Sequence, residues 1–209
     1  YYKPDVYVGL PSIAKYLAEV GKQRGLSLKN DIGLKLLYFG GEGLSPALRK
    51  RYEQHWGAPS LMQYGSSETG GIALECSSGN MHVQAGHVIV EVVDPETGAP
   101  VPPGTPGDIL VTTLLRRGSP VIRYRIGDMG ILSQEPCSCG ISLPVLKLLG
   151  RKKDFLLINE KEYSLYFLEE LLLRNEEIGD DYRIKIGRNK LVLQLELQQE
   201  SNSIALAGR

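Results

Sequence analysis

Cysteine is scarce in this sequence, with three residues among 209. An odd and low number of cysteines does not fit the disulfide framework that small secreted domains use. The first five residues, Tyr-Tyr-Lys-Pro-Asp, also lack the basic, apolar and small-residue order of a secretory signal. We therefore expect a cytoplasmic protein in a reducing compartment.

Net charge and long apolar runs are missing as well. Lys plus Arg number 24 and Asp plus Glu number 24, so no overall field attracts nucleic acid or a membrane surface. Apolar runs such as residues 88–93 fall far short of the roughly 20 residues that a spanning helix needs. We expect neither a nucleic-acid partner nor a membrane segment, and an anionic ligand must be held by local groups.

The composition that is present is that of a folded globular protein. Hydrophobic residues make up 42% and charged residues 23%, which excludes a disordered chain and a collagen-like repeat. The 24 glycines exceed the usual share of about 7% and predict tight turns or loops that approach a ligand closely.

The first third of the chain alternates between helical and strand patterns. Residues 11–24 and 45–56 have helical spacing of apolar positions, whereas residues 33–39 and 60–63 resemble short strands. Gly40-Gly41 and the segment 64–71 (Tyr-Gly-Ser-Ser-Glu-Thr-Gly-Gly) follow these strands. In an open α/β sheet, loops at the carboxyl ends of strands hold ligands.

The pattern changes after Cys76. Residues 88–93, 108–114 and 121–124 are rich in β-formers, and turn residues separate them. A helical pattern at 165–173 precedes two strand-like runs at 182–186 and 191–197, which a hairpin at 187–190 would join.

These patterns predict a mixed α/β protein in three parts. Residues 1–76 would be part of an open α/β subdomain, residues 77–150 a small antiparallel β subdomain, and residues 151–209 a small α+β unit, which the family resemblance described below implies is the start of a C-terminal lid domain.

The segment 64–71 has the composition of a phosphate-binding loop. Its glycines let backbone N–H groups approach an anion, and its hydroxyls and one carboxylate suit a nucleotide phosphate with a divalent metal. By itself, a Gly/Ser-rich segment is more often an ordinary turn.

Four segments in order resemble the core motifs of adenylate-forming enzymes, and most closely those of phenylacetate-CoA ligases. They are residues 39–42 (Phe-Gly-Gly-Glu), 64–68 (Tyr-Gly-Ser-Ser-Glu), 124–128 (Tyr-Arg-Ile-Gly-Asp) and 150–154 (Gly-Arg-Lys-Lys-Asp). The resemblance covers nearly the whole chain. Each motif is weak alone, and their common order indicates homology.

The resemblance implies a nucleotide site. Gly40, Gly41 and Glu42 would lie along the adenine of ATP or AMP, and Tyr64, followed by Gly65, would pack on its face, since an aromatic ring is a good platform for a purine.

It also implies the remaining contacts. Ser67 would contact the α-phosphate, Glu68 would hold Mg²⁺, and Asp128 would accept hydrogen bonds from the ribose hydroxyls with Arg151 nearby. A plain Gly-Asp turn is the alternative for Asp128. Asp154 matches the hinge about which such enzymes rotate their C-terminal domain.

The three cysteines suggest a second site. Cys76, Cys137 and Cys139 with His82 make up the ligand set of a closed tetrahedral Zn²⁺ site, and the arrangement resembles structural zinc sites of some relatives. His87 could replace His82, and buried, metal-free thiols are the alternative.

The resemblance implies the C-terminal half of an AMP-forming carboxylate-CoA ligase that joins an aromatic acid to CoA through an acyl-adenylate. The family's phosphate loop and its late lysine have no counterpart here, so we expect no ligase activity from this chain alone, and whether it is an enzyme stays open. The missing N-terminal region or a homodimer partner would complete the site. Glu160 and Leu165, where relatives have glycine and proline, bring thioester formation into question.

Two other functions remain open. One is a non-catalytic, zinc-stabilised module that binds nucleotide or another protein. The other is an adenylating enzyme that passes the acyl group to a carrier protein.

Overall fold

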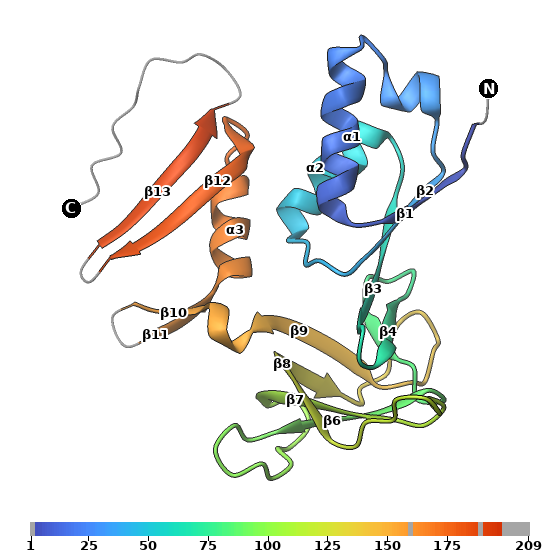
Figure 1. The fold of residues 1–209 in the computed structure, drawn as a ribbon, viewed down its shortest axis with the longest axis vertical. Coiled ribbons are helices and arrows are strands. Elements are labelled where there is room, and N and C mark those ends of the chain that lie inside the picture. The colour runs from blue at the N-terminus through green and yellow to red at the C-terminus, as the bar shows by residue number, and fades with distance from the viewer. Residues whose placement is uncertain (1–2, 159–160, 188–189, 198–209) are drawn as a thin grey trace.

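The computed structural model describes residues 3–158, 161–187 and 190–197 (Figure 1). Within them lie a nine-stranded mixed sheet and two two-stranded antiparallel sheets, which confirms the predicted mixed α/β class. The strands of the large sheet follow the order β1-β2-β3-β4-β5-β9-β8-β7-β6. The elements and their bounds are β1 (Val6–Gly9), α1 (Pro11–Gln23), a π-helical turn (Leu28–Ile32), β2 (Leu36–Gly40), α2 (Pro46–Trp56), β3 (Ser60–Ser66), β4 (Gly70–Glu75), β5 (Met81–Val83), β6 (Val88–Val93), β7 (Pro106–Thr113), β8 (Tyr124–Ser133), β9 (Val145–Arg151), a 3-10 turn (Lys152–Asp154), β10 (Phe155–Ile158), β11 (Lys161–Ser164), α3 (Leu165–Leu173), β12 (Ile178–Gly187) and β13 (Lys190–Leu197).

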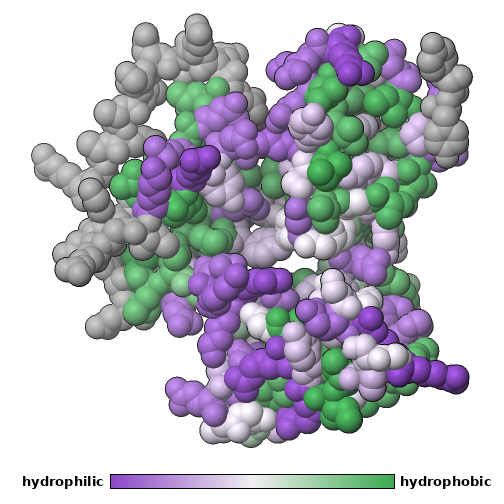
Figure 2. Space-filling model, viewed as in Figure 1, coloured by the Kyte–Doolittle hydropathy of each residue, from purple (hydrophilic) through white to green (hydrophobic). Residues whose placement is uncertain are grey.

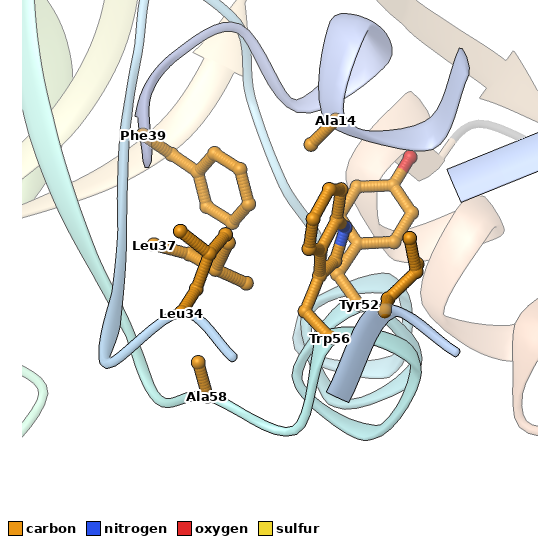
Figure 3. Close-up of a cluster of buried hydrophobic side chains, with 8 residues drawn as sticks. Ala14, Leu34, Leu37, Phe39, Tyr52, Trp56 and Ala58 are labelled. Atoms are coloured by element: carbon orange, nitrogen blue, oxygen red, sulfur yellow. The ribbon is translucent and has the colours of Figure 1, made fainter. Parts of the chain in front are cut away.

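The first part of the sheet is parallel and packs against α1 and α2. Leu37 and Phe39 alternate with their neighbours along β2, so both point to the same face, where they are fully buried (Figure 3). Tyr52 and Trp56 of α2 close this core from the helix side. The core holds the carboxyl ends of β2 and β3 side by side.

The opposite face of this parallel segment is uncovered within the described chain. Val6 and Val8 of β1 pair in register with Leu36 and Tyr38 of β2, and Val8 is 70% exposed. Figure 2 also shows hydrophobic residues on the surface of the part that contains α1. Parallel sheets normally have both faces covered, so this face is suited to a further layer of polypeptide.

The second part of the sheet is antiparallel and has its own core. Ile72, Val88, Ile109, Val111 and Leu146 form its buried centre. The sheet is continuous across Cys76, where the sequence suggested a boundary, although the two cores are separate. Within this antiparallel part, β5 and β9 meet at a narrow seam, because they share a single pair of Cα partners, His82 and Val145.

The third part follows the 3-10 turn and carries α3 and the two small sheets, beside α2 in Figure 1. The predicted helix at 165–173 and the pairing of the last two strands are confirmed. Arg188 and Asn189 of the predicted hairpin, and Glu160, lie outside the described residues.

Several details of the local structure differ from the predictions. The strands β1, β4, β5, β9, β10 and β11 were missed, and Tyr64–Ser66, expected in a loop, continues β3. The strand expected at 121–124 begins at Tyr124 instead and runs to Ser133. Arg123 has a left-handed backbone, with φ of 48°, which a strand cannot continue through.

Candidate functional site

A cavity of about 370 Å³ opens where the three parts of the chain meet. Its walls come from the carboxyl ends of β2 and β3, from β8 and β9, and from the segment after the 3-10 turn. The residues that line the cavity include Gly41, Glu42, Gly43, Tyr64, Gly65, Asp128, Arg151, Asp154, Ser164 and Tyr166.

Tyr64 and Asp128, which are far apart in the sequence, meet in this cavity. The Tyr64 hydroxyl donates a hydrogen bond of 2.7 Å to Asp128 Oδ2, and Arg151 Nε lies 3.5 Å from Asp128 Oδ1. Burial, and then the Asp128 carboxylate, raise the pKa of Tyr64 well above its usual value, so the phenol stays protonated and donates. Asp128 thus has a fixed orientation beside an aromatic ring.

Gly65 lets the chain pass very close to the neighbouring strand. A Cβ atom added to Gly65 would lie 2.3 Å from the carbonyl oxygen of Gly70, so a side chain would push β3 and β4 apart. Gly41 has a left-handed backbone, with φ of 79°, as the chain leaves β2. Both glycines shape the cavity wall, whereas Gly40 lies just before it in β2.

Glu42 lines the cavity, but its carboxylate is already engaged. Its two oxygens accept hydrogen bonds from the backbone N–H and the hydroxyl of Ser12, at 2.9 and 2.7 Å. A carboxylate is favourable at this end of α1 because the first turn of a helix has unpaired N–H groups. Glu42 therefore fastens α1 to the cavity wall.

Ser67 and Glu68 lie outside the cavity lining, on the exposed turn between β3 and β4. The Ser67 carbonyl accepts a hydrogen bond of 2.8 Å from Arg116. A hydrogen bond from the Ser66 side chain holds the pKa of Glu68 below its usual value, with further contributions from Arg116 and Arg151. Glu68 is thus ionised, as a metal ligand must be, but it does not join Tyr64 and Asp128 in one cavity.

Sequence reasoning missed Gly43, Ser164 and Tyr166. Tyr166 reaches back from α3 into the cavity across the predicted hinge, and burial raises the pKa of its phenol to about 12. A Cβ atom at Gly43 would lie 1.2 Å from the Tyr166 oxygen, so this contact requires glycine. The available signal was an aromatic residue in the first turn of the helix that follows the predicted hinge.

A second cluster gathers the four predicted metal ligands. The ligand atoms of Cys76, His82, Cys137 and Cys139 all lie within 4.8 Å of one another. Cys76 Sγ and Cys137 Sγ are 3.8 Å apart, which is too far for a disulfide and matches two sulfurs at about 2.3 Å from one tetrahedral Zn²⁺. His82, not His87, is the imidazole of the cluster.

The imidazole is oriented as a metal ligand would be. His82 Nδ1 lies 2.9 Å from the Leu143 carbonyl oxygen, and Nε2 lies 3.3 Å from Cys139 Sγ. A bond from one ring nitrogen to a carbonyl fixes the tautomer and leaves the other nitrogen free to ligate. The backbone N–H of Cys139 helps to lower the pKa of Cys137 to about 6. Three sulfurs and one nitrogen in this arrangement fit a structural Zn²⁺.

The fold and the cavity define the class of protein, namely a mixed α/β protein with a ligand cavity at the carboxyl ends of parallel strands. Comparison with known proteins agrees: the sequence pattern of the family described as AMP-binding enzyme matches residues 1–114. The chain belongs to the AMP-binding enzyme family, which confirms the predicted relationship.

Individual relatives refine the comparison. The phenylacetate-coenzyme A ligase of Thermus thermophilus is 33% identical over 204 residues, which are 95% of this chain and 46% of that protein. A 2-hydroxyisobutyryl-CoA ligase in the postadenylation state, in complex with R3-HIB-AMP, superposes with a TM-score of 0.87 at 29% identity, over 93% of this chain and 44% of the other. The same ligase with 2-HIB-AMP and CoA in the thioesterification state superposes with a TM-score of 0.67 at 28% identity, over 92% of this chain and 43% of the other. The chain spans about half the length of the relatives it matches.

No helix in the described ranges is long and apolar enough to cross a membrane. The cytoplasmic location stays a prediction.

Proposed function

We propose that this chain supplies the nucleotide-binding part of an AMP-forming carboxylate-CoA ligase. The observation that carries the proposal is the meeting of Tyr64, Asp128 and Arg151 in one cavity at the carboxyl ends of parallel strands. Membership of the AMP-binding family and the ligase relatives support it.

Each residue of the cavity would contact a different part of AMP. The Tyr64 ring would stack on adenine beside the glycine wall at Gly40 and Gly41. Asp128 would accept from both ribose hydroxyls, because a carboxylate has lone pairs for two donors, and Arg151 would hold its orientation. The carboxylate of Glu42 already binds Ser12, so only its backbone and stem are available to the base.

The reaction we propose has two steps. A carboxylate oxygen of the acid bonds to the α-phosphorus of ATP and pyrophosphate leaves; the CoA sulfur then bonds to the acyl carbon and AMP leaves. Ser67 would contact the α-phosphate, and Glu68 would hold Mg²⁺, which offsets negative charge on the phosphates. Both residues must turn toward the cavity, since in this structure they lie on the exposed turn beside it.

The acid substrate is proposed to be aromatic, as phenylacetate is, because the Thermus thermophilus relative is a phenylacetate-coenzyme A ligase. The uncovered face with Val6 and Val8 is where the remaining polypeptide of such an enzyme, or a second copy of the chain, would pack.

The relative position of the parts supports a hinge at Asp154. This chain superposes better on the ligase in the postadenylation state than on the thioesterification state, with TM-scores of 0.87 and 0.67. We propose that the structure shows the arrangement that encloses adenylate, with Ser164 and Tyr166 as one wall, and that the part after Asp154 rotates for the CoA step.

The Cys76, His82, Cys137 and Cys139 cluster would hold a structural Zn²⁺. Cys76 and His82 belong to the β4–β5 hairpin, and the other two cysteines belong to the loop before β9. The metal would therefore clamp the narrow seam where β5 meets β9 at one residue pair.

Calorimetry with AMP tests the proposed nucleotide site. The full chain should bind AMP with one-to-one stoichiometry, and ribose 5-phosphate, which lacks the base, should bind at least about fivefold more weakly because stacking contributes roughly 1–3 kcal/mol. Absence of AMP binding by a folded chain would remove the proposal.

A further inference from the structure

The start of α2 is capped by side chains from the far side of the hinge. Pro46 has no N–H, and Ser45 Oγ accepts from the N–H of Leu48 at 3.3 Å. The N–H groups of Ser45 and Ala47 are bonded to the carboxylates of Glu169 and Glu170 on α3, at 3.2 and 2.7 Å. Carboxylates are favourable here because a helix begins with unpaired N–H groups and the positive end of its dipole.

The end of α3 is capped in return by Arg51 of α2. One terminal nitrogen donates to the carbonyls of Leu173 and Asn175, at 2.7 and 2.9 Å. The other donates to the Ile178 carbonyl and to Asp180 Oδ1, both at 2.7 Å. All four acceptors lie after the hinge, and the side chains of Arg51 and Asp180 are only 10% and 11% exposed.

We infer that this reciprocal capping is a latch that selects the arrangement in which the C-terminal part encloses the nucleotide cavity. The latch comprises Ser45, Ala47 and Arg51 on one side and Glu169, Glu170, Asp180 and the carbonyls at the end of α3 on the other. The inference rests on the proposed function for its biological meaning.

The energetic reason is that the latch bonds exist in one arrangement only. Rotation about Asp154 separates α2 from α3. The buried guanidinium of Arg51, the first turn of α2 and the last turn of α3 then lose their hydrogen-bond partners together. Interactions made in a single state shift an equilibrium by their full difference in free energy between the states. Arg51 and Glu170 are therefore positioning residues, which hold Tyr166 against Gly43 without touching the ligand.

Small-angle X-ray scattering and hydrogen exchange on the full chain without nucleotide test the latch. Arg51→Met should increase the radius of gyration and speed exchange of the Ser45, Ala47 and Leu48 amides at least about tenfold, because it leaves buried partners unpaired. The matched control is Lys50→Met, which removes the same charge from the exposed neighbouring residue and should leave both readouts unchanged.

A second variant separates a latch from a purely local cap. The double variant Glu169→Ala, Glu170→Ala removes both acceptors on the other side of the interface, and it should change the scattering in the same direction as Arg51→Met, with Arg51→Lys intermediate. Faster exchange in α3 with an unchanged scattering curve would overturn the inference, as would no change in either readout. Neither readout involves AMP, so they report on the latch even where the nucleotide site fails its own test.

Discussion

Replacing Asp128 with alanine should weaken AMP binding by at least about tenfold, because hydrogen bonds to a charged group contribute about 1.5–3 kcal/mol. In the structure Asp128 is held by Tyr64 and Arg151, so its carboxylate has a fixed orientation, and we propose that it accepts from the two ribose hydroxyls in this orientation. Titration calorimetry of the wild-type chain and the variant measures the difference, and equal urea midpoints establish that both are folded.

Two comparisons show whether the Asp128→Ala variant loses its contact with the ribose hydroxyls. 2′,3′-Dideoxy-AMP should bind the wild-type chain as weakly as AMP binds the Asp128→Ala variant, and the variant should not distinguish the two nucleotides. Tyr64→Phe removes the hydrogen bond to Asp128 and keeps the ring, so it should reduce affinity by less than Tyr64→Ala. An Asp128→Ala chain that still prefers AMP over the dideoxy compound would contradict the ribose assignment.

Loss of the metal centre should have a large effect on stability. The chain purified without chelator should contain one zinc ion per molecule, measured by mass spectrometry of the metal. Cys137→Ser should abolish that stoichiometry and lower the free energy of unfolding by several kcal/mol, since binding of structural zinc contributes roughly 10–16 kcal/mol in small domains.

The position of the Cys76, His82, Cys137 and Cys139 cluster predicts which part of the chain loses stability when the metal is absent. Exchange should accelerate first at the β5–β9 seam, where the two strands share a single pair of Cα partners. Ser138→Ala is the matched control: it lies between two proposed ligands, and its hydroxyl bonds only at the surface, to Ser78. A metal-free wild-type chain of full stability would refute the zinc proposal.

Much of the fold could be predicted because local patterns agree with it. The helices at Pro11–Gln23, Pro46–Trp56 and Leu165–Leu173 have clear apolar spacing and start signals, and the structure places them there. The strand β1 was missed because four residues carry almost no periodicity. The start of β8 was misplaced because its boundary depends on the left-handed backbone at Arg123, which no residue preference indicates.

The site was predicted in part for a similar reason. Motifs specify which residue types are needed, so Tyr64 with Asp128 and the four candidate metal ligands were predicted from the sequence, and the structure brings each group together. The bond between Glu42 and Ser12, and the approach of Tyr166 to Gly43, depend on how separate parts of the chain pack. Such contacts are set by tertiary geometry, which the local sequence does not encode.

Hydrogen exchange of the full chain with and without AMP shows directly where the nucleotide binds. We expect slower exchange around the cavity, in residues 41–44, 64–66, 126–129, 150–151 and 164–166. A separate groove of about 500 Å³, lined by α1, the π-helical turn and the last two strands, should be unaffected. Protection confined to that groove, or saturating AMP that protects no cavity segment, would contradict the assignment of an adenylate site to Tyr64 and Asp128.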